Sequence, residues 1–336
     1  MPTFCRHNRF VERCPICSKT LAGASPGGGG SSRAKSIRSV GSDGEASRRR
    51  RVRNEKMRVH REGRAEDDGY RSDLVPGIRA SADALRLVQE ISFAGGRVLA
   101  LEVEPPGLYS EACLLAGDDL EQASWMCFLI AYLSPLEDDD PFAGIRMALA
   151  RMPRPPAGDG LSDLEGIPLG PRTCHDPARG ADTLLAYGQW VAGVGGGAQA
   201  AALAGDPAWS PERRFERLFE RLALSGFRRM GRYDLLVTLG RLGLYELRAD
   251  SLHFTSANES SSGDLATLAA KRVFAIGDSL NLERRARRLA EAISVPVETL
   301  DLALANWGSE VRATLGFPRE TRDQHTLERC QEALEL

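Results

Sequence analysis

Four candidate metal ligands lie close together near the start of the chain. Cys5, His7, Cys14 and Cys17 fall within the string CRHNRFVERCPIC. Three thiolates and one imidazole satisfy tetrahedral Zn(II) without an open position, so we predict a structural zinc knuckle in residues 1–18. The alternatives are a chance cluster and a redox-active CxxC pair. A redox pair opens a helix of an α/β unit, whereas short, charged, loop-like sequence surrounds this motif.

A second group of residues has the chemistry to bind an anion. Arg228, Arg229 and Arg232 lie in the segment GFRRMGRYDLL, which the pattern places in a short connection before a helix that begins near Tyr233. Guanidinium forks and free backbone N–H groups at a helix start suit a phosphate. The alternative is ordinary solvated surface charge.

A third group surrounds a glycine turn in the segment KRVFAIGDSLNLERR. Lys271 precedes the turn at Gly277, and Asp278 or Ser279 can cap the helix that follows it. The alternative to simple capping is a hairpin that grips a nucleic-acid backbone, with Lys271 or Arg284 on a phosphate.

One further motif contains the residue types of a nucleophile system. Cys174, His175 and Asp176 are adjacent in the sequence. Neighbours in sequence rarely point at one another, so we expect no catalytic triad here.

The elements that must position these residues are mostly α-helical. Apolar residues recur at helical spacing over residues 73–336, and no repeated βα pattern appears. We expect a helix over 84–91 that ends at Gly95 and Gly96, with 98–103 either a strand or a helical turn. A helix over 119–133 is apolar on nearly every side and is expected to run through the centre of the domain. Residues 151–181 are expected to cross the surface. Later helices are expected from 211, on both sides of Gly277, and around 300–307 and 327–334.

Charge divides the chain into a basic head and an acidic body. Residues 1–72 carry 17 Lys and Arg against 8 Asp and Glu, and residues 73–336 carry 27 against 38. Residues 19–72 contain too few apolar side chains to offset the entropy of ordering them, so we predict a disordered basic linker. Its arginine run at 48–51 either contacts nucleic-acid phosphates or only aids solubility.

No segment predicts a membrane or a secreted protein. The longest apolar stretch, ASWMCFLIAYL, is about half of the roughly 20 residues that cross a bilayer. Met1 is not followed by a basic and then apolar signal segment. We therefore expect a cytoplasmic protein that uses no membrane.

Five segments together resemble a known family. They are the CRHNRFVERCPIC knuckle, WMCFLIAYLSPLEDDDPF, GFRRMGRYDLL, KRVFAIGDSLNLERRARRLA and LDLALANWG. In these segments the chain resembles the clade 3 alpha-glutamyl/putrescinyl thymine pyrophosphorylases, which are related to helical DNA glycosylases. The resemblance implies a helical, glycosylase-like body that acts on DNA carrying a modified pyrimidine.

The implied reaction is base hypermodification. An amine, either an amino acid or putrescine, replaces pyrophosphate on a 5-pyrophosphoryloxymethyl uracil. This chemistry requires cations for the leaving pyrophosphate, a base for the amine and a pocket for an extruded nucleotide. The candidate cations are Arg228, Arg229, Arg232 and Lys271. The candidate base is Asp278 or an acid of the run 137–140.

The resemblance also has a departure that keeps other functions open. Helical glycosylases usually carry a Gly-x-Gly hairpin with an aspartate further along, and here only Gly277 and Asp278 remain, with Asp301 downstream. One alternative is a glycosylase-like base excision enzyme that uses Asp301. The other is a noncatalytic zinc-containing adaptor that binds nucleic acid. A cavity lined by 228–232 and 271–278 favours an enzyme, and a filled core there favours the adaptor.

Overall fold

The computed structural model describes residues 65–156, 164–255 and 263–336. The chain divides into two units, Met1–His60 and Arg61–Leu336, and only the second contains described residues. The predicted zinc ligands and most of the predicted linker therefore lie outside the described residues.

Within the described residues the regular structure is helical and no strand occurs, which confirms the mostly α prediction. The first helices are α2 (Ser81–Val103), α3 (Leu108–Ala116), α4 (Leu120–Leu133) and α5 (Ala143–Arg151). A 3-10 turn, η2 (Pro177–Arg179), precedes α6 (Asp182–Val194), α7 (Gln199–Ala204), α8 (Pro211–Arg221) and α9 (Arg229–Arg241). The chain closes with α10 (Leu265–Phe274), α11 (Ser279–Ala292), α12 (Thr299–Gly308) and α13 (Gln324–Ala333).

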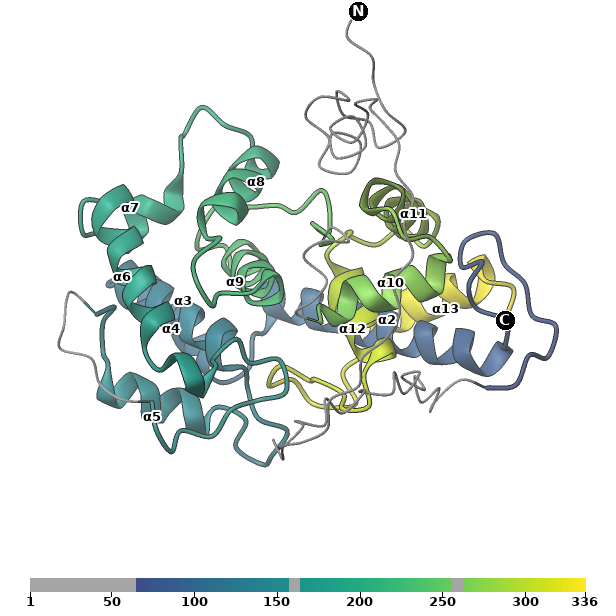
Figure 1. Cartoon of the computed structure of the whole chain (residues 1–336), viewed down its shortest axis with the longest axis horizontal. Helices are drawn as coiled ribbons and strands as arrows, with labels where there is room; N and C mark the ends of the chain where they lie inside the picture. Colours follow the sequence, from purple (N-terminus) through teal and green to yellow (C-terminus); the bar gives the residue numbers. More distant parts are fainter. Residues whose placement is uncertain (1–64, 157–163, 256–262) are drawn as a thin grey trace, which may run out of the picture. The chain divides into compact units, whose positions relative to one another are not determined.

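The helices pack around two long members, α2 and α4. α12 and α13 pack against α2, α10 packs against both α12 and α11, and α3, α5 and α7 pack against α4. α9 contacts α4 and α2, so it lies between the two groups (Figure 1). The helix α9 is therefore held by helices from both groups, a rigid base for the side chains that it carries.

The helix α4 is buried on every side, as its composition predicts. Asp119 caps it by accepting a hydrogen bond from the backbone N–H of Gln122 at 2.9 Å. All residues from 123 to 133 are buried. The helix ends at Ser134, just before Pro135, and the segment thereby supplies the apolar centre of its group of helices.

The prediction that the first helix ends at Gly95 and Gly96 is wrong. α2 continues through both glycines to Val103. A Cβ atom on Gly96 would lie 2.7 Å from the carbonyl carbon of Arg322, so the missing side chain lets this backbone segment approach. Here glycine marks close packing rather than a helix end.

The prediction that residues 151–181 cross the surface is also wrong for its described second half. Leu164, Ile167, Arg172 and Cys174 are buried. The backbone N–H of Cys174 donates to the carbonyl of Tyr132 at 2.8 Å, which ties this segment to the end of α4. Proline and glycine set the turns here, but the side chains between them enter the core.

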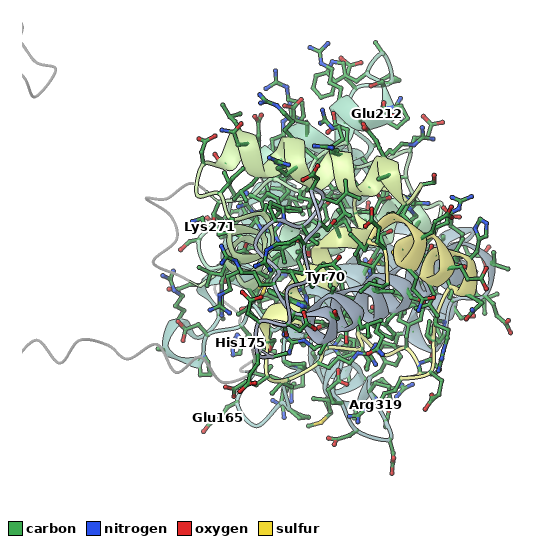
Figure 2. All side chains as sticks on the ribbon, turned by 90° about the vertical axis from the view of Figure 1, so that its right-hand side faces the viewer. Tyr70, Glu165, His175, Glu212, Lys271 and Arg319 are labelled. Atoms are coloured by element: carbon green, nitrogen blue, oxygen red, sulfur yellow. The ribbon has the colours of Figure 1, made fainter. Side chains whose placement is uncertain are left out.

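Residues just before the predicted body boundary contact the body. Tyr70, labelled in Figure 2, is half-buried and its Oη donates to the carbonyl of Leu334 at 2.8 Å. Asp68 accepts a hydrogen bond from the backbone N–H of Ser81 at 3.0 Å, at the start of α2. The last residues of the predicted linker segment are thus attached to the first and last helices.

A buried histidine predicts how stability depends on pH. His253 follows α9 and stacks on Phe219, with ring centroids 4.2 Å apart. Burial, the largest cause, lowers the pKa of His253 to about 4, and its buried Nε2 has no hydrogen-bond partner among the described residues.

Acidification below the usual histidine pKa of 6.5 is expected to destabilise the protein. The imidazole of the unfolded chain takes up a proton near that pH, whereas the folded one does so only near pH 4. Between these values the loss amounts to about 1.4 kcal/mol per pH unit. His253→Asn removes the titrating ring and tolerates the φ of 51° at this position. Denaturant titrations should show a flatter pH dependence for the variant, and an equal slope would contradict the assignment.

Candidate functional site

The three arginines of the GFRRMGRYDLL segment meet at the start of α9. The helix begins at Arg229, with Arg228 as its N-cap, so the predicted start near Tyr233 is wrong and Arg229 and Arg232 lie within the first turns. The turn that leads in depends on Gly226, whose φ is 82° and whose Cβ position lies 2.0 Å from Oγ1 of Thr183. A side chain does not fit there, so the turn that aims Arg228 requires glycine.

A cavity of about 200 Å³ opens beside this helix start. Its lining residues are Arg228, Arg229, Met230, Arg232, Thr255, Gly263 and Asp264. Arg228 is exposed and forms no ion pair with any described residue. The side chain of Arg228 is therefore available to an anion that enters the cavity.

Arg232 is held by an aromatic ring. Its guanidinium lies 4.3 Å from the ring centroid of Phe219, and its Nη1 donates to the carbonyl of Phe219 at 3.0 Å. The side chain is half-buried. This stacking fixes the direction of the guanidinium while leaving the positive charge at the cavity wall.

Arg229 belongs to a buried ion-pair network behind the cavity. Its Nε donates to Asp264 at 2.9 Å, its Nη1 to the carbonyl of Leu252 at 2.6 Å, and its Nη2 to Asp301. Only 3% of the Arg229 side chain is exposed. All three nitrogens are engaged, so Arg229 orders the wall of the cavity rather than offering a free fork.

The network continues to Arg172. Its Nη2 donates to Asp301 at 2.9 Å and its Nε to Asp234 at 3.1 Å. Asp301 lies on α12, and the backbone N–H of Arg172 donates to Ser134 at the end of α4 at 3.3 Å, so the network joins the two groups of helices, with Asp234 on α9 between them. Asp264, which also caps α10, has a lowered pKa: burial raises it, but Arg229 and the hydrogen bonds from Thr267 outweigh burial.

Asp301 is the residue that a glycosylase mechanism would use. It is 2% exposed and bound to both Arg172 and Arg229. It is not among the residues that line the cavity beside the start of α9. The carboxylate thus acts as the bridge of the ion-pair network.

Lys271 and Asp278 do not line the cavity beside α9. Asp278 is exposed and caps α11 by accepting from the backbone N–H of Asn281 at 3.0 Å, which confirms its predicted capping role. Lys271, labelled in Figure 2, lies on α10 and is half-buried.

The acidic run 137–140, the other candidate for the base, makes contacts of its own. Glu137 accepts from the backbone N–H of Thr314 at 2.7 Å, and Asp140 pairs with Arg146.

A second cavity, of about 500 Å³, shares Arg228 with the first. It is lined by Cys174, Asp176, Arg179, Leu224, Gly226, Phe227 and Arg228. Asp176 caps η2 by accepting from the backbone N–H of Ala178 at 3.0 Å, and its carboxylate lies 3.7 Å from Nε of Arg179. Arg228 therefore stands between two cavities, one of which contains a carboxylate without a buried ion pair.

The structure does not assemble a triad from Cys174, His175 and Asp176. Burial raises the pKa of the Cys174 thiol. Nδ1 of His175 lies 2.9 Å from the hydroxyl of Tyr132. Asp176 nevertheless lines the cavity beside Arg228. The sequence signal that points to this residue is an aspartate placed to cap a short helix directly after a buried segment.

The helix α11 carries a basic face. The arginines of α11 are Arg284, Arg285, Arg287 and Arg288. None of them forms an ion pair with a described residue. The guanidinium groups of α11 thus leave positive charge at the surface, and this residue type in this density is typical of contacts with phosphate.

Two kinds of feature are absent from the described residues, a cluster of metal ligands and a membrane-spanning helix. These residues contain no group of three or more His, Cys, Asp or Glu side chains placed to hold a metal ion. None of the helices formed by the described part of the chain is both long and apolar enough to cross a membrane.

Comparison with known proteins agrees with the sequence motifs. No curated protein and no solved structure matches the chain. The segment of the predicted zinc knuckle and the other residues before 174 lie outside the stretch that matches a family model. Residues 174–315 match the model for alpha-glutamyl/putrescinyl thymine pyrophosphorylase clade 3, and the resemblance drawn from the sequence is thereby confirmed for that stretch.

Proposed function

We propose that the chain hypermodifies thymine-derived bases in DNA, replacing pyrophosphate on a 5-pyrophosphoryloxymethyl uracil with an amine. One observation carries the proposal. Every residue that lines the two cavities beside Arg228 lies within residues 174–315, the stretch that matches the pyrophosphorylase family. The matched segment therefore contains both a cationic wall and two adjoining spaces, as a reaction between two substrates requires.

The proposed step breaks one bond and forms one. The amine nitrogen attacks the methylene carbon attached to the uracil ring, and the bond from that carbon to the pyrophosphate oxygen breaks. Arg228 and Arg232 stabilise the charge that develops on the departing pyrophosphate. Asp176 accepts the proton that the amine loses, because the other carboxylate lining the cavities, Asp264, is bound to Arg229.

Arg229 and Asp301 act in this proposal as positioning residues. Their buried network fixes the first turn of α9, from which Arg228 and Arg232 project. A base excision mechanism is the weaker alternative, since it would use Asp301, whose carboxylate is bound by two guanidinium groups. The adaptor alternative does not need the cavities beside α9.

The test is mass spectrometry of nucleosides from DNA that carries pyrophosphorylated hydroxymethyl uracil. The DNA is incubated with the full chain and with glutamate or putrescine in separate reactions. The expected product has the mass of the amine adduct and appears together with one released pyrophosphate per modified base. Release of the free base without an adduct would instead support base excision. DNA that the chain binds but leaves chemically unchanged would support the adaptor.

DNA capture is proposed to depend on the basic face of α11 and on the arginine run at 48–51. Both groups are expected to bind phosphates without reading sequence. Because residues 73–336 carry more acidic than basic side chains, association with DNA requires such local basic patches.

Replacing Arg284, Arg287 and Arg288 by alanine should flatten the salt dependence of DNA binding. Each lost phosphate contact on duplex DNA reduces the slope of log K against log salt by about 0.9. Fluorescence titrations at several salt concentrations measure this slope. Arg217→Ala, an exposed arginine of α8, is the matched control, and equal slopes for the triple variant and the control would contradict a phosphate-binding role for α11.

The zinc site remains a proposal from ligand types and spacing. Cys5, His7, Cys14 and Cys17 are proposed to hold one structural Zn(II). Metal analysis of the purified chain should give about one zinc equivalent, and Cys14→Ala should lower it strongly. Cys113→Ala, a cysteine of α3 outside the motif, should leave the zinc content unchanged. Zinc-free protein with a protease-resistant N-terminus would contradict the proposal.

A further inference from the structure

A third cavity lies away from α9, against α2 and α13. Its volume is about 330 Å³, within the usual range for small-molecule sites. It is lined by Leu85, Val88, Gln89, Ser92, Phe93, Arg312, Arg319, Thr321, Arg322, Leu327 and Gln331. Most of these residues lie outside the stretch 174–315 that matches the pyrophosphorylase family. The cavity is therefore independent of the proposed reaction.

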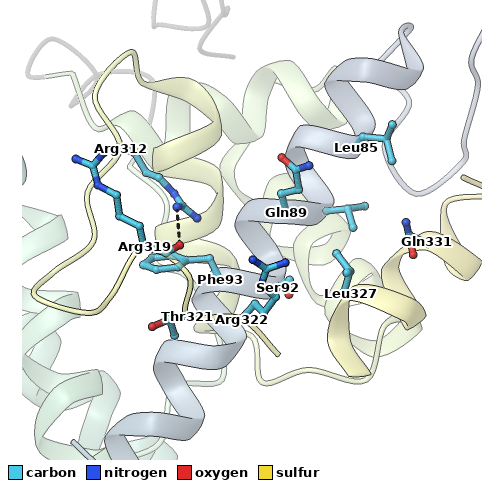
Figure 3. Close-up of a pocket in the computed structure, with 11 residues that line it drawn as sticks. Leu85, Gln89, Ser92, Phe93, Arg312, Arg319, Thr321, Arg322, Leu327 and Gln331 are labelled. Carbon is cyan, nitrogen blue, oxygen red and sulfur yellow. Dashed lines mark hydrogen bonds between the residues drawn. The ribbon is translucent and has the colours of Figure 1, made fainter. Parts of the chain in front are cut away.

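The cavity has a cationic side. Figure 3 shows Arg312 and Arg319 on loops at one side of α2, with Arg322 between them and α13. Arg322 forms no ion pair with a described residue, and only its Nε is engaged, donating to the carbonyl of Glu320 at 3.3 Å. A guanidinium with free terminal nitrogens at a cavity wall suits a phosphate.

The neighbouring acids leave this charge only partly balanced. Arg312 donates from Nε to Glu90 at 3.0 Å, and Arg319 lies 4.0 Å from Glu137. Asp323 is turned to its own helix, where it caps α13 and accepts from Thr326. Among the arginines that line the cavity, Arg322 is the one without an ion pair to a described residue.

The other side of the cavity is apolar, and two amides stand beside it. Leu85 of α2 is 39% exposed, and Leu327 of α13 packs only partly against the core. The side-chain amides of Gln89 and Gln331 form no hydrogen bond with any described residue, and in Figure 3 they project from α2 and α13 near these leucines. An amide can donate and accept, as the edge of a nucleobase requires.

We infer that this cavity binds a nucleotide, with its phosphate on Arg322 and Arg319 and its base between Leu85 and Leu327. The base edge faces Gln89 and Gln331. A phosphate alone leaves the apolar walls and the amides unused, and an uncharged nucleoside leaves the arginines unused. The same chemistry is offered by a free nucleotide and by one nucleotide of a DNA strand.

The test is isothermal titration calorimetry of the full chain. The probes are the four deoxynucleoside 5′-monophosphates, the matching deoxynucleosides, inorganic phosphate and a short single-stranded oligonucleotide. At least one monophosphate, or the oligonucleotide, is expected to bind one site per chain. Arg322→Ala is expected to weaken that binding tenfold or more, because a charged hydrogen bond is lost, and Gln331→Leu is expected to weaken it as well.

Two control variants separate this site from the others. Arg217→Ala tests for a general effect of removing an exposed arginine, and Arg228→Ala removes the cation of the proposed reaction site. Neither is expected to change the affinity, so the inference stands or falls apart from the proposed function. If Arg322→Ala weakens binding of a monophosphate, the ligand is a free nucleotide. If only the oligonucleotide binds, and Arg322→Ala weakens that binding, the ligand is one nucleotide of a strand.

Three results would overturn the inference. The first is binding of nucleotides that is unchanged in Arg322→Ala. The second is that inorganic phosphate or the uncharged nucleosides bind as tightly as the monophosphates. The third is that neither the monophosphates nor the oligonucleotide bind.

Discussion

Replacing Arg229 by methionine is expected to lower the free energy of unfolding by about 3–5 kcal/mol, because removing one partner leaves buried charges uncompensated. Asp264 loses its only ion-pair partner among the described residues, and Asp301 keeps only Arg172. The carbonyl of Leu252 also loses the donor that lies 2.6 Å away. Urea titration at neutral pH measures the loss.

The pH dependence of this loss distinguishes charge from packing. In the native chain the pKa of Asp264 is lowered, so its contribution to stability is present at neutral pH and is lost as pH falls through that pKa. Without Arg229 burial dominates and the pKa rises, so the folded variant takes up a proton more readily than the unfolded chain. The deficit of Arg229→Met should therefore shrink as pH is lowered, and a deficit that is constant with pH would indicate lost packing alone.

Asp301→Asn is the matched comparison within the same network. Each guanidinium keeps another aspartate, since Arg172 still pairs with Asp234 and Arg229 with Asp264. We expect a smaller loss, of about 1–3 kcal/mol, from weakened charged hydrogen bonds. If Asp301→Asn instead lowered the free energy of unfolding by more than Arg229→Met, the link that Asp301 makes between Arg172 and Arg229 would matter more than leaving single charges unpaired.

The helices could be predicted where one physical signal dominated. Ser210 and Pro211 mark the start of α8, and Ser210 indeed accepts from the backbone N–H of Arg213 at 3.3 Å. Residues 123–133 are apolar throughout and form the buried α4. Gly96 misled the prediction, because local propensity cannot reveal that a distant segment packs against a glycine inside a helix.

The candidate site was predicted only in part, for a similar reason. The cluster of Arg228, Arg229 and Arg232 was visible in the sequence, but their division into exposed and buried members was not. Arg172, 57 positions before Arg229 and within a segment rich in proline and glycine, carried no sign of burial. Ion pairs between distant segments depend on how helices pack, and sequence spacing does not encode that packing.

Replacing Arg228 by alanine is expected to lower turnover of pyrophosphorylated DNA by about 10²–10³-fold, the usual effect of removing one group that stabilises transition-state charge. The fold should be unaffected, because Arg228 is exposed and forms no ion pair with a described residue. The free energy of unfolding should change by less than about 0.5 kcal/mol. Rates of pyrophosphate release at saturating amine measure the effect.

The controls test whether the loss comes from the leaving group. Arg248→Ala removes another exposed arginine, one whose side chain is 69% exposed beside Glu212, and should retain full turnover. Asp176→Asn should also slow turnover, but only Arg228→Ala should weaken inhibition by added pyrophosphate, because the carboxylate is proposed to meet the amine and the guanidinium the phosphates. Full turnover in Arg228→Ala would place the reaction away from these two cavities, since Arg228 is the one residue that both share among their lining residues.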